Sequence, residues 1–203
     1  ATLSTEESIG NPRFVKKSKE KLANAQRLLS SKKKGSKRRA LARRAVSKIH
    51  ENISNQRRNF IWQVASYLTK KFDGFAVEKL NIKGLVQKED SYRNLRRGIM
   101  DAAWRQFVHA LSCKAEEAGM EFAAVDPKNT TQNCSGCGTK VPKALSDRVH
   151  NCPHCGLVLN RDPNAAINIL ERGKEILSGF PTTPKQPRVE VGSRSFAAEN
   201  SPL

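Results

Sequence analysis

The chain has 203 residues, 37% of them apolar, and a formal net charge of +18 at pH 7. This length is enough for one sizeable core and a small appended module, and a mean hydropathy of −0.61 is typical of a soluble protein. No apolar run approaches the roughly 20 residues that a membrane-spanning helix needs, and the first residues lack the basic start and apolar stretch of a signal peptide. We therefore expect a cytoplasmic protein that does not bind a membrane.

The first twelve residues are typical of a pair of short strands, and the sequence begins inside the first of them. Residues 1–5 and 7–9 have the composition of strand segments, and Gly10, Asn11 and Pro12 form a turn signal after them. The chain also begins at Ala1 rather than at Met. We therefore expect it to be a piece of a longer protein that lacks its N-terminal part.

The positive charge is concentrated in residues 13–58, which contain 17 Lys or Arg against two Glu. Because folding gains nothing from crowding like charges, this excess predicts a polyanionic partner, and nucleic acid is the commonest one. The alternative is a solvated helix face or a disordered linker. The candidate nucleic-acid-binding residues are Lys32, Lys33, Lys34, Lys37, Arg38, Arg39, Arg43, Arg44, Arg57 and Arg58.

Apolar residues recur at mostly four-residue steps from Leu41 to Leu68, which predicts a long amphipathic helix over about residues 38–71. A shorter helix is expected over about 16–31, and Gly35-Ser36 supplies the break between the two. The two helices together predict a basic helical hairpin across residues 12–72.

The remaining elements alternate between strands and helices. The sequence predicts a strand at 75–80, a helix at 95–118, a strand at 121–125 and a helix at 163–177. Asp162 is expected to be the N-cap of the last helix and Pro163 to lie in its first turn. This order predicts an α/β fold with helices packed on a sheet, followed by a flexible tail over 179–203.

Four cysteines form two Cys-x-x-Cys pairs with fourteen residues between them, Cys134 with Cys137 and Cys152 with Cys155. This spacing lets four thiolates surround one zinc ion, so we predict a zinc ribbon across 128–160. Two disulfides are the alternative, but they persist mainly in oxidising compartments, for which the sequence gives no signal. Cys113 is expected to be a small core residue rather than a fifth ligand.

Several motifs carry a family resemblance when they are taken in order. They are Val77-Glu78-Lys79-Leu80-Asn81-Ile82-Lys83-Gly84, Lys114-Ala115-Glu116 before Gly119, Val125-Asp126-Pro127, the cysteine pairs, and Arg161-Asp162-Pro163-Asn164-Ala165-Ala166-Ile167-Asn168-Ile169. Over about residues 1–177 the chain resembles the TnpB (OrfB) proteins of bacterial insertion sequences, which have long been described as transposases. The resemblance implies an RNase H-like domain of the RuvC type, formed by residues 1–127 and 161–178, with the helical hairpin and the zinc ribbon as insertions.

The resemblance also implies the activity, cofactors and partners. Proteins of this kind cut DNA with magnesium under the direction of a guide RNA and are related to the type V CRISPR effectors. The implied partners are DNA and a guide RNA, and the implied location is the bacterial cytoplasm, in association with the nucleoid.

Two residues match the family's catalytic carboxylates. Glu78 corresponds to the second and Asp162 to the third, and both would bind magnesium, provided that they meet at one place in the fold. The alternatives are a capping or salt-bridged carboxylate for Glu78 and a plain N-cap for Asp162.

The first catalytic Asp of the family lies on the opening strand, a few residues upstream of Ala1. We therefore expect the sheet to be incomplete at its first strand, and this chain not to cut DNA alone. The alternative function is a cleavage-incompetent nucleic-acid-binding module with a zinc ribbon, as a remnant or a regulator.

Overall fold

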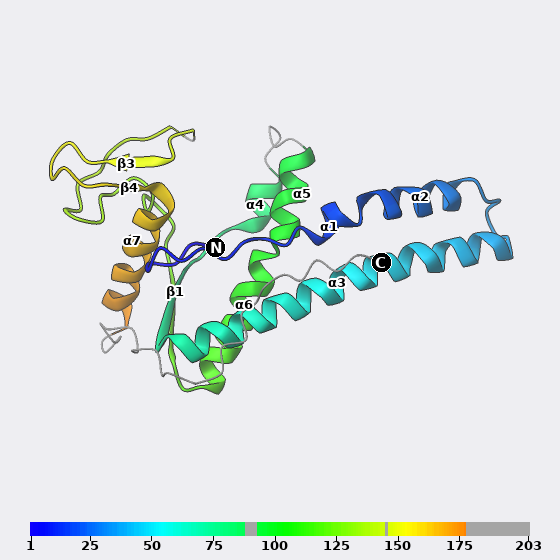
Figure 1. Cartoon of the computed structure of the whole chain (residues 1–203), viewed down its shortest axis with the longest axis horizontal. Helices are drawn as coiled ribbons and strands as arrows, with labels where there is room; N and C mark the ends of the chain where they lie inside the picture. The colour runs from blue at the N-terminus through cyan, green and yellow to red at the C-terminus, as the bar shows by residue number, and fades with distance from the viewer. Residues whose placement is uncertain (88–92, 145, 178–203) are drawn as a thin grey trace.

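The computed structural model describes residues 1–87, 93–144 and 146–177. The elements, in chain order, are α1 (Phe14–Lys17), α2 (Lys19–Ser30), α3 (Lys37–Lys71), β1 (Gly74–Glu78), α4 (Ile82–Gln87), α5 (Arg93–Ala102), α6 (Trp104–Glu117), β2 (Glu121–Val125), β3 (Val149–Asn151), β4 (Val158–Asn160) and α7 (Arg161–Ile176). Helix α7 covers one face of the sheet of β1 and β2, and α6 with the end of α3 covers the other (Figure 1). The mixed α/β class predicted from the sequence is confirmed. The expected tail, 179–203, lies outside the described residues.

The N-terminal residues form a turn closed by one isolated antiparallel bridge, and not the pair of strands that the composition indicates. Thr2 and Ser8 make an antiparallel bridge, and the amide of Ile9 donates to the carbonyl of Ala1 at 2.7 Å. The segment packs against the core through Leu3 and Ile9. In the described part of the chain, no helix has both the length and the apolar character needed to cross a bilayer.

Helices α2 and α3 pack against each other and project from the rest of the molecule as a hairpin (Figure 1). Gly35 turns the chain with φ +81°, and the Ser36 side chain caps α3 by accepting a hydrogen bond from the amide of Arg39 at 3.1 Å. Because an α-helix rises 1.5 Å per residue, α3 is about 52 Å long. The predicted long helix is confirmed within one residue at its start.

The core lies where the C-terminal half of α3 meets α6 and the sheet. Its buried members are Ile61, Ala65, Leu68, Phe75, Val77, Ala110, Leu111 and Ala115. The prediction of one helix over 95–118 is wrong, because the chain breaks at Ala103, whose φ is 49°. This left-handed residue redirects the chain, so that Asp101 pairs with Arg57 of α3 at 2.8 Å while Trp104 packs against the core.

Strands β1 and β2 are parallel, with Ala76 opposite Ala123 and Glu78 opposite Val125. Side chains alternate between the two faces of a strand. Phe75 and Val77 belong to the core cluster on the α3–α6 side, whereas Ala76 and Ala123 lie beneath Gly173 of α7. Because Glu78 shares the parity of Ala76, it projects on the same face of the sheet as α7.

Strands β3 and β4 form a small antiparallel hairpin within the segment that carries the four cysteines. Strand β4 ends at Asn160 and α7 begins at Arg161. The prediction that Asp162 is the N-cap is therefore wrong, because Asn160 occupies that position and Asp162 lies in the first turn. A carboxylate is favourable there, because the exposed amides at a helix start carry partial positive charge.

Candidate functional site

A pocket of about 470 Å³ opens beside the C-terminal end of β1. Glu78 and Asp162 both line it, although 83 residues separate them in the sequence. The N-terminal segment 1–5 forms another part of the wall, and apolar side chains of α6 and α7 form much of the remainder. The fold therefore brings the two acidic residues of the sequence hypothesis to one cavity.

The carboxylate of Glu78 is held at one oxygen. Its Oε1 accepts a hydrogen bond from the Thr130 hydroxyl at 2.7 Å, and Thr130 itself is 2% exposed. Glu78 is half-buried at the end of its strand. Among the residues that the structure describes, Oε2 has no hydrogen-bond partner, so this oxygen is available to a ligand in the pocket.

The carboxylate of Asp162 is open to solvent. Its side chain is 62% exposed, and Oδ1 lies 3.6 Å from Nε of the neighbouring Arg161. Burial lowers the pKa of the Ala1 amino group, and the negative charge of Asp162 partly opposes that shift. Asp162 is therefore close enough to the N-terminal wall of the pocket to act on it electrostatically.

The pocket's donor set fits a hard divalent cation. Magnesium binds through one or two carboxylates and keeps several of its waters, and an open pocket with two carboxylates leaves room for that water. Within 1–87, 93–144 and 146–177, groups of three or more clustered His, Cys, Asp or Glu side chains are confined to the four cysteines. Asp73 also lines the pocket, but in the described residues it does not cluster with Glu78 and Asp162 as a group of three.

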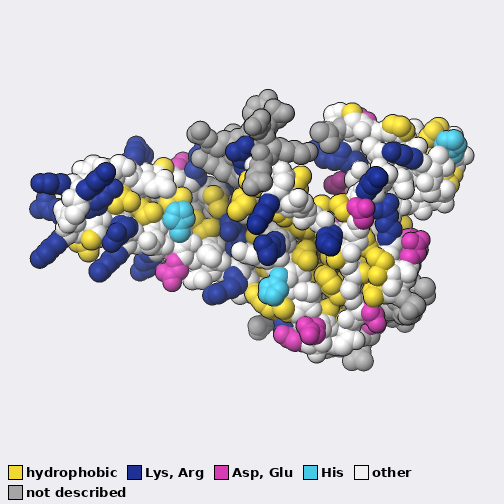
Figure 2. Space-filling model, turned by 180° about the vertical axis from the view of Figure 1, so that it is seen from behind, with side chains coloured by type: hydrophobic (Ala, Val, Ile, Leu, Met, Phe, Trp, Pro, Cys, Tyr) yellow, Lys and Arg dark blue, Asp and Glu magenta, His cyan; other side chains and the backbone are white. Residues whose placement is uncertain are grey.

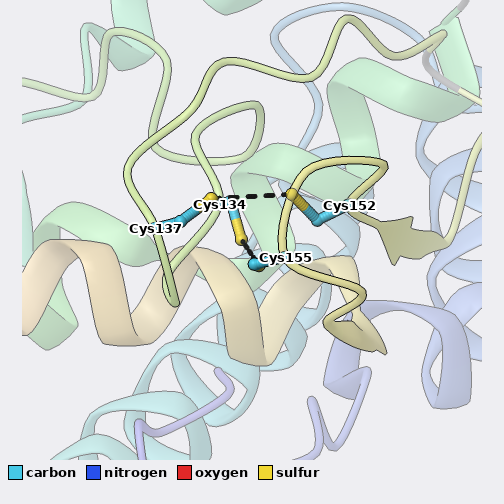
Figure 3. A group of neighbouring side chains, drawn as sticks. All are labelled: Cys134, Cys137, Cys152 and Cys155. Carbon is cyan, nitrogen blue, oxygen red and sulfur yellow. Dashed lines mark hydrogen bonds between the residues drawn. The ribbon is translucent and has the colours of Figure 1, made fainter.

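The four predicted cysteines form one cluster, with their sulfur atoms all within 4.8 Å of one another (Figure 3). Cys134 and Cys155 have their Sγ atoms 3.6 Å apart, as do Cys137 and Cys152. A tetrahedral site with metal–sulfur bonds of about 2.3 Å requires sulfur separations of about 3.8 Å. The cluster therefore fits one tetrahedral metal ion, and all four cysteines are free rather than disulfide-bonded.

The thiols of this cluster differ in acidity. The pKa of Cys137 is lowered to about 6, mainly because the Thr139 side chain hydrogen-bonds to it. The amide of Leu157 lowers the pKa of Cys155, but its contact with Cys134 and its burial outweigh that effect and raise the value to about 12. Such coupling is expected when several thiols share one small volume, and a bound cation would favour the thiolate form of each.

Two asparagines of α7 join the cysteine-bearing segment to this helix. Asn164 is fully buried; its Nδ2 donates to the Asn133 carbonyl at 2.8 Å, and its Oδ1 accepts from the Ser135 amide at 3.0 Å. Asn168, one turn later, donates to the carbonyls of Thr130 at 2.9 Å and Asn133 at 2.8 Å. The sequence analysis assigned these residues no role, although their four-residue spacing places both on one helix face.

The basic residues crowd over the α2–α3 hairpin, as Figure 2 shows at the narrow end of the molecule. Seven of the ten candidates are exposed: Lys33, Lys34, Lys37, Arg38, Arg43, Arg44 and Arg58. Lys32 is half-buried. Arg58 also donates to Asn55 at 3.2 Å. Lys48, which the sequence analysis omitted, is exposed on the same strip of α3 as Lys37 and Arg44, at steps of seven and four residues.

Two of the candidate residues, Arg39 and Arg57, bond to groups outside their own helix. Arg39 donates through NH1 to the carbonyls of Leu29 and Lys32, both at 2.9 Å, and so completes the C-terminal end of α2. Arg57 pairs with Asp101, and the Asp101 side chain is only 9% exposed. These two guanidinium groups support the fold directly.

Comparison with known proteins gives matches over most of the chain. Residues 1–89 match a family described as "Probable transposase", and residues 104–169 match one described as "Cas12f1-like, TNB domain". A "Putative RNA-guided DNA endonuclease" from Streptomyces pristinaespiralis is 36% identical over 176 residues, which are 85% of this chain and 42% of that protein. The Escherichia coli K12 protein "Putative RNA-guided DNA endonuclease InsQ" is 30% identical over 190 residues, which are 88% of this chain and 47% of that protein.

The fold resembles that of a solved CRISPR-Cas12f ternary complex. The TM-score is 0.54 at 24% sequence identity, and the match covers 80% of this chain and 34% of that one. The chain spans less than half the length of the curated relatives named above. The two family matches and the relatives agree with the motifs, and the chain belongs to the TnpB (OrfB) family.

Proposed function

We propose that this chain is the nuclease portion of a TnpB-type, RNA-guided DNA endonuclease with an RNase H-like fold of the RuvC type. Glu78 and Asp162 are its magnesium ligands, and the four cysteines hold a structural zinc ion. One observation carries the proposal: carboxylates from two elements far apart in the sequence line one pocket beside the end of a parallel strand.

The fold class and the relatives support this assignment. The chain alternates strand, helix, strand and helix around parallel strands β1 and β2, and ligand sites of such sheets lie outside the carboxyl ends of the strands. Glu78 is the last residue of β1. The printed names of the Streptomyces and Escherichia coli relatives describe RNA-guided DNA endonucleases.

The chemistry assigned to the pocket is phosphodiester hydrolysis. Bound magnesium would lower the pKa of a water molecule and neutralise charge on the phosphate. Glu78 contributes a carboxylate that is held by the hydrogen bond from Thr130. Asp162 contributes a solvated carboxylate on the first turn of α7. The apolar wall formed by α6 and α7 limits the water around the reacting group.

The hairpin and the cysteine ribbon form the nucleic-acid-binding part of the proposal. The seven exposed candidate cations and Lys48 carry no contact to an acidic side chain of the described chain, so their charge is available to phosphates. DNA and a guide RNA are the proposed partners. Residues 1–127 and 161–178 form the nuclease domain of this proposal, and residues 128–160 form the ribbon.

The experiment is a cleavage assay on the complete gene product assembled with a guide RNA, in wild-type form and with Glu78→Gln or Asp162→Asn. Each substitution removes a metal-binding charge and keeps the size of the side chain. Since metal stabilisation of the transition state is worth several kcal/mol, we expect cleavage to fall by about 10³-fold or more. DNA affinity, measured by filter binding, should change by less than about threefold, because neither residue belongs to the basic hairpin.

Glu175→Gln is the matched control, because Glu175 is an exposed glutamate near the far end of α7. It should cut at the wild-type rate. Undiminished cleavage by Glu78→Gln would remove the nuclease assignment and leave the alternative, a nucleic-acid-binding module without cleavage activity.

A further inference from the structure

We propose that Thr130 is the positioning residue of the Glu78 carboxylate, and that through it the cysteine ribbon and α7 together set the orientation of this metal ligand. The inference rests on the proposed function, because it concerns how Glu78 binds its metal. Thr130 belongs to neither the cysteine cluster nor the family motifs, and it lies in the turn between β2 and the first cysteine pair.

The Thr130 hydroxyl has one hydrogen and two acceptors within reach. Oε1 of Glu78 lies at 2.7 Å and the carbonyl of Pro127 at 3.1 Å. A hydroxyl donates one hydrogen bond, and bonds to an ionised acceptor are shorter and roughly twice as strong as neutral ones. The Thr130 hydroxyl therefore donates its hydrogen bond to the Glu78 carboxylate. Because Thr130 is 2% exposed, water competes little for this bond.

This hydrogen bond fixes the Glu78 side chain. Glutamate has three side-chain torsions, so a carboxylate at a strand end can point in several directions. With Oε1 anchored by Thr130, the carboxylate has fewer accessible orientations and Oε2 stays available to the pocket. Groups that orient a metal ligand from behind typically contribute 10- to 100-fold to metal affinity or activity.

Thr130 is in turn fixed by α7. Its carbonyl accepts a hydrogen bond from Asn168 Nδ2 at 2.9 Å, and the second hydrogen of the same amide reaches the carbonyl of Asn133 at 2.8 Å. Both hydrogens of the Asn168 amide are therefore engaged. Since Asp162 lies on the same helix, one rigid element carries one metal ligand and holds the support of the other.

The same set of bonds reaches the cysteine cluster. The Asn133 carbonyl also accepts from Asn164 Nδ2 at 2.8 Å, and Asn164 Oδ1 accepts from the amide of Ser135, which lies within the first cysteine pair. These partly buried hydrogen bonds thus run without a gap from the ribbon, through the two asparagines, to Thr130 and Glu78. A ribbon that holds its metal keeps Thr130 in place, and Thr130 keeps Glu78 in place.

The test measures metal binding rather than activity. Manganese(II), which uses the same oxygen ligands as magnesium, is titrated into the complete gene product, and the free ion is followed by electron paramagnetic resonance. The variants are Thr130→Val, which removes the hydroxyl at nearly constant volume, Thr130→Ser, which restores it, and Glu78→Gln. Thr69→Val is the matched control, because the Thr69 hydroxyl bonds only to carbonyls of its own helix, α3.

We expect Thr130→Val to weaken manganese binding about tenfold, Thr130→Ser to stay within about twofold of wild type, and Thr69→Val to have no effect. In the Glu78→Gln background, Thr130→Val should cause no further loss, because it acts through that carboxylate. Circular dichroism and zinc content verify that each variant is folded.

The outcomes separate this inference from the proposed function. If Glu78→Gln weakens manganese binding but Thr130→Val does not, the positioning role is wrong and the nuclease site stands. If Glu78→Gln itself has no effect, the proposed site is wrong. If Thr130→Val fails to fold while Thr130→Ser folds, the hydroxyl serves the fold and not the ligand, and the inference is overturned.

Discussion

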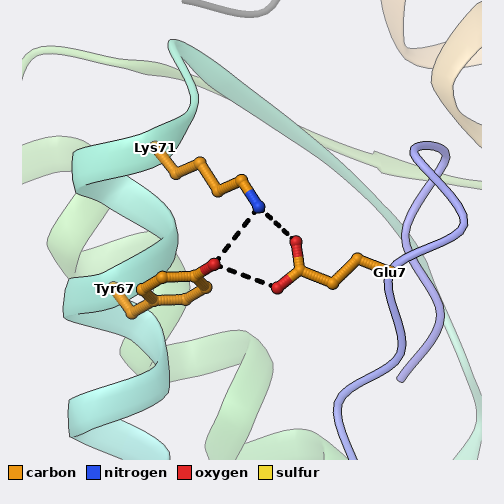
Figure 4. A network of polar contacts seen from close by, with 3 residues as sticks. All are labelled: Glu7, Tyr67 and Lys71. Carbon is orange, nitrogen blue, oxygen red and sulfur yellow. Dashed lines mark hydrogen bonds and ion pairs between the residues drawn. The ribbon is translucent and has the colours of Figure 1, made fainter. Parts of the chain in front are cut away.

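Glu7 shows how a single carboxylate ties the N-terminal segment to the longest helix. Its two oxygens meet the Tyr67 hydroxyl, at 3.0 Å, and the Lys71 ammonium group (Figure 4). Lys71 also donates to the Tyr67 hydroxyl at 3.2 Å. The three side chains form a closed triangle at the end of α3, next to the segment that walls the candidate site.

The charges of this triangle respond to pH in opposite directions. The hydrogen bond from Lys71 lowers the pKa of Glu7, and the hydrogen bond to Glu7 raises the pKa of Lys71. The stability from Glu7 is therefore present above its unfolded pKa of about 4.3 and is lost as pH falls through the lower folded pKa. The stability from Lys71 is present below about pH 10.4 and is lost only as pH rises through the higher folded pKa.

Glu7→Gln should lower the free energy of unfolding by about 0.5 to 1 kcal/mol at pH 7, because the pair is partly exposed. The difference from wild type should fade as pH falls through the lowered folded pKa of Glu7, because the carboxyl group is then protonated in both states. Urea unfolding at a series of pH values measures this. Glu6→Gln is the neighbouring control, and a difference that persisted in acid would contradict the assignment.

At the scale of the elements, the contact between α7 and the sheet decides where Asp162 lies. Gly173 sits directly over β1, so a Cβ atom at this position would lie 2.4 Å from the Cβ of Ala76 and 3.7 Å from that of Ala123. Small residues on both sides let the helix approach the strands closely. The first turn of α7 is thereby held over the end of β1, where Glu78 lies.

Gly173→Ala should destabilise the protein although alanine favours helices. Overpacking costs typically 1 to 3 kcal/mol and helix propensity returns roughly 1 kcal/mol, so we expect a net loss of up to about 2 kcal/mol. Gly98→Ala is the matched control, because Gly98 is an exposed helical glycine with open space around its Cα; it should gain about 0.5 to 1 kcal/mol. Thermal unfolding of both variants measures the sign, and equal shifts would contradict this packing.

Local patterns predicted most of these elements, and tertiary contacts explain what they missed. The apolar period of α3 and the spacing of the four cysteines are properties of neighbouring residues, so the sequence predicts them well. The break at Ala103 accompanies the ion pair between Asp101 and Arg57, which lie 44 residues apart in the sequence. The spacing of apolar residues along a helix does not predict such a long-range pair. Likewise, nothing local distinguishes Thr130 from any other turn threonine, because its partner Glu78 is 52 residues distant.

At the scale of the molecule, the charge is segregated. The α2–α3 hairpin carries exposed Lys and Arg side chains and projects away from the pocket that contains Glu78 and Asp162 (Figures 1 and 2). A polyanion held along the hairpin therefore meets the molecule at a different place from the acidic pocket. The exposed cations of the hairpin therefore do not pair with Glu78 or Asp162; the neighbouring cation of Asp162 is Arg161 of its own helix.

Replacing Lys37, Arg44 and Lys48 together by Gln should lower the salt dependence of nucleic-acid binding. Each phosphate contact contributes about 0.7 to 0.9 to the slope of log affinity against log salt concentration, so the magnitude of the slope should fall by about 2 to 3. Titrations at four or more salt concentrations measure it.

Arg39→Gln is the contrasting variant, because this guanidinium already bonds to the Leu29 and Lys32 carbonyls. It should lower the melting temperature and leave the slope almost unchanged. An unaltered slope for the triple variant would exclude the strip from the binding surface.

The direct junction between β4 and α7 has a mechanical consequence. The strand ends at Asn160 and the helix begins at Arg161, so no linker residue separates the cysteine ribbon from the helix. A change in the orientation of the cysteine ribbon would therefore also move Asp162, which lies only two residues after the end of β4. A chimera that replaces the cysteine ribbon with another must therefore keep the direction of the last strand, β4. Otherwise the first turn of α7 will hold Asp162 in a different orientation.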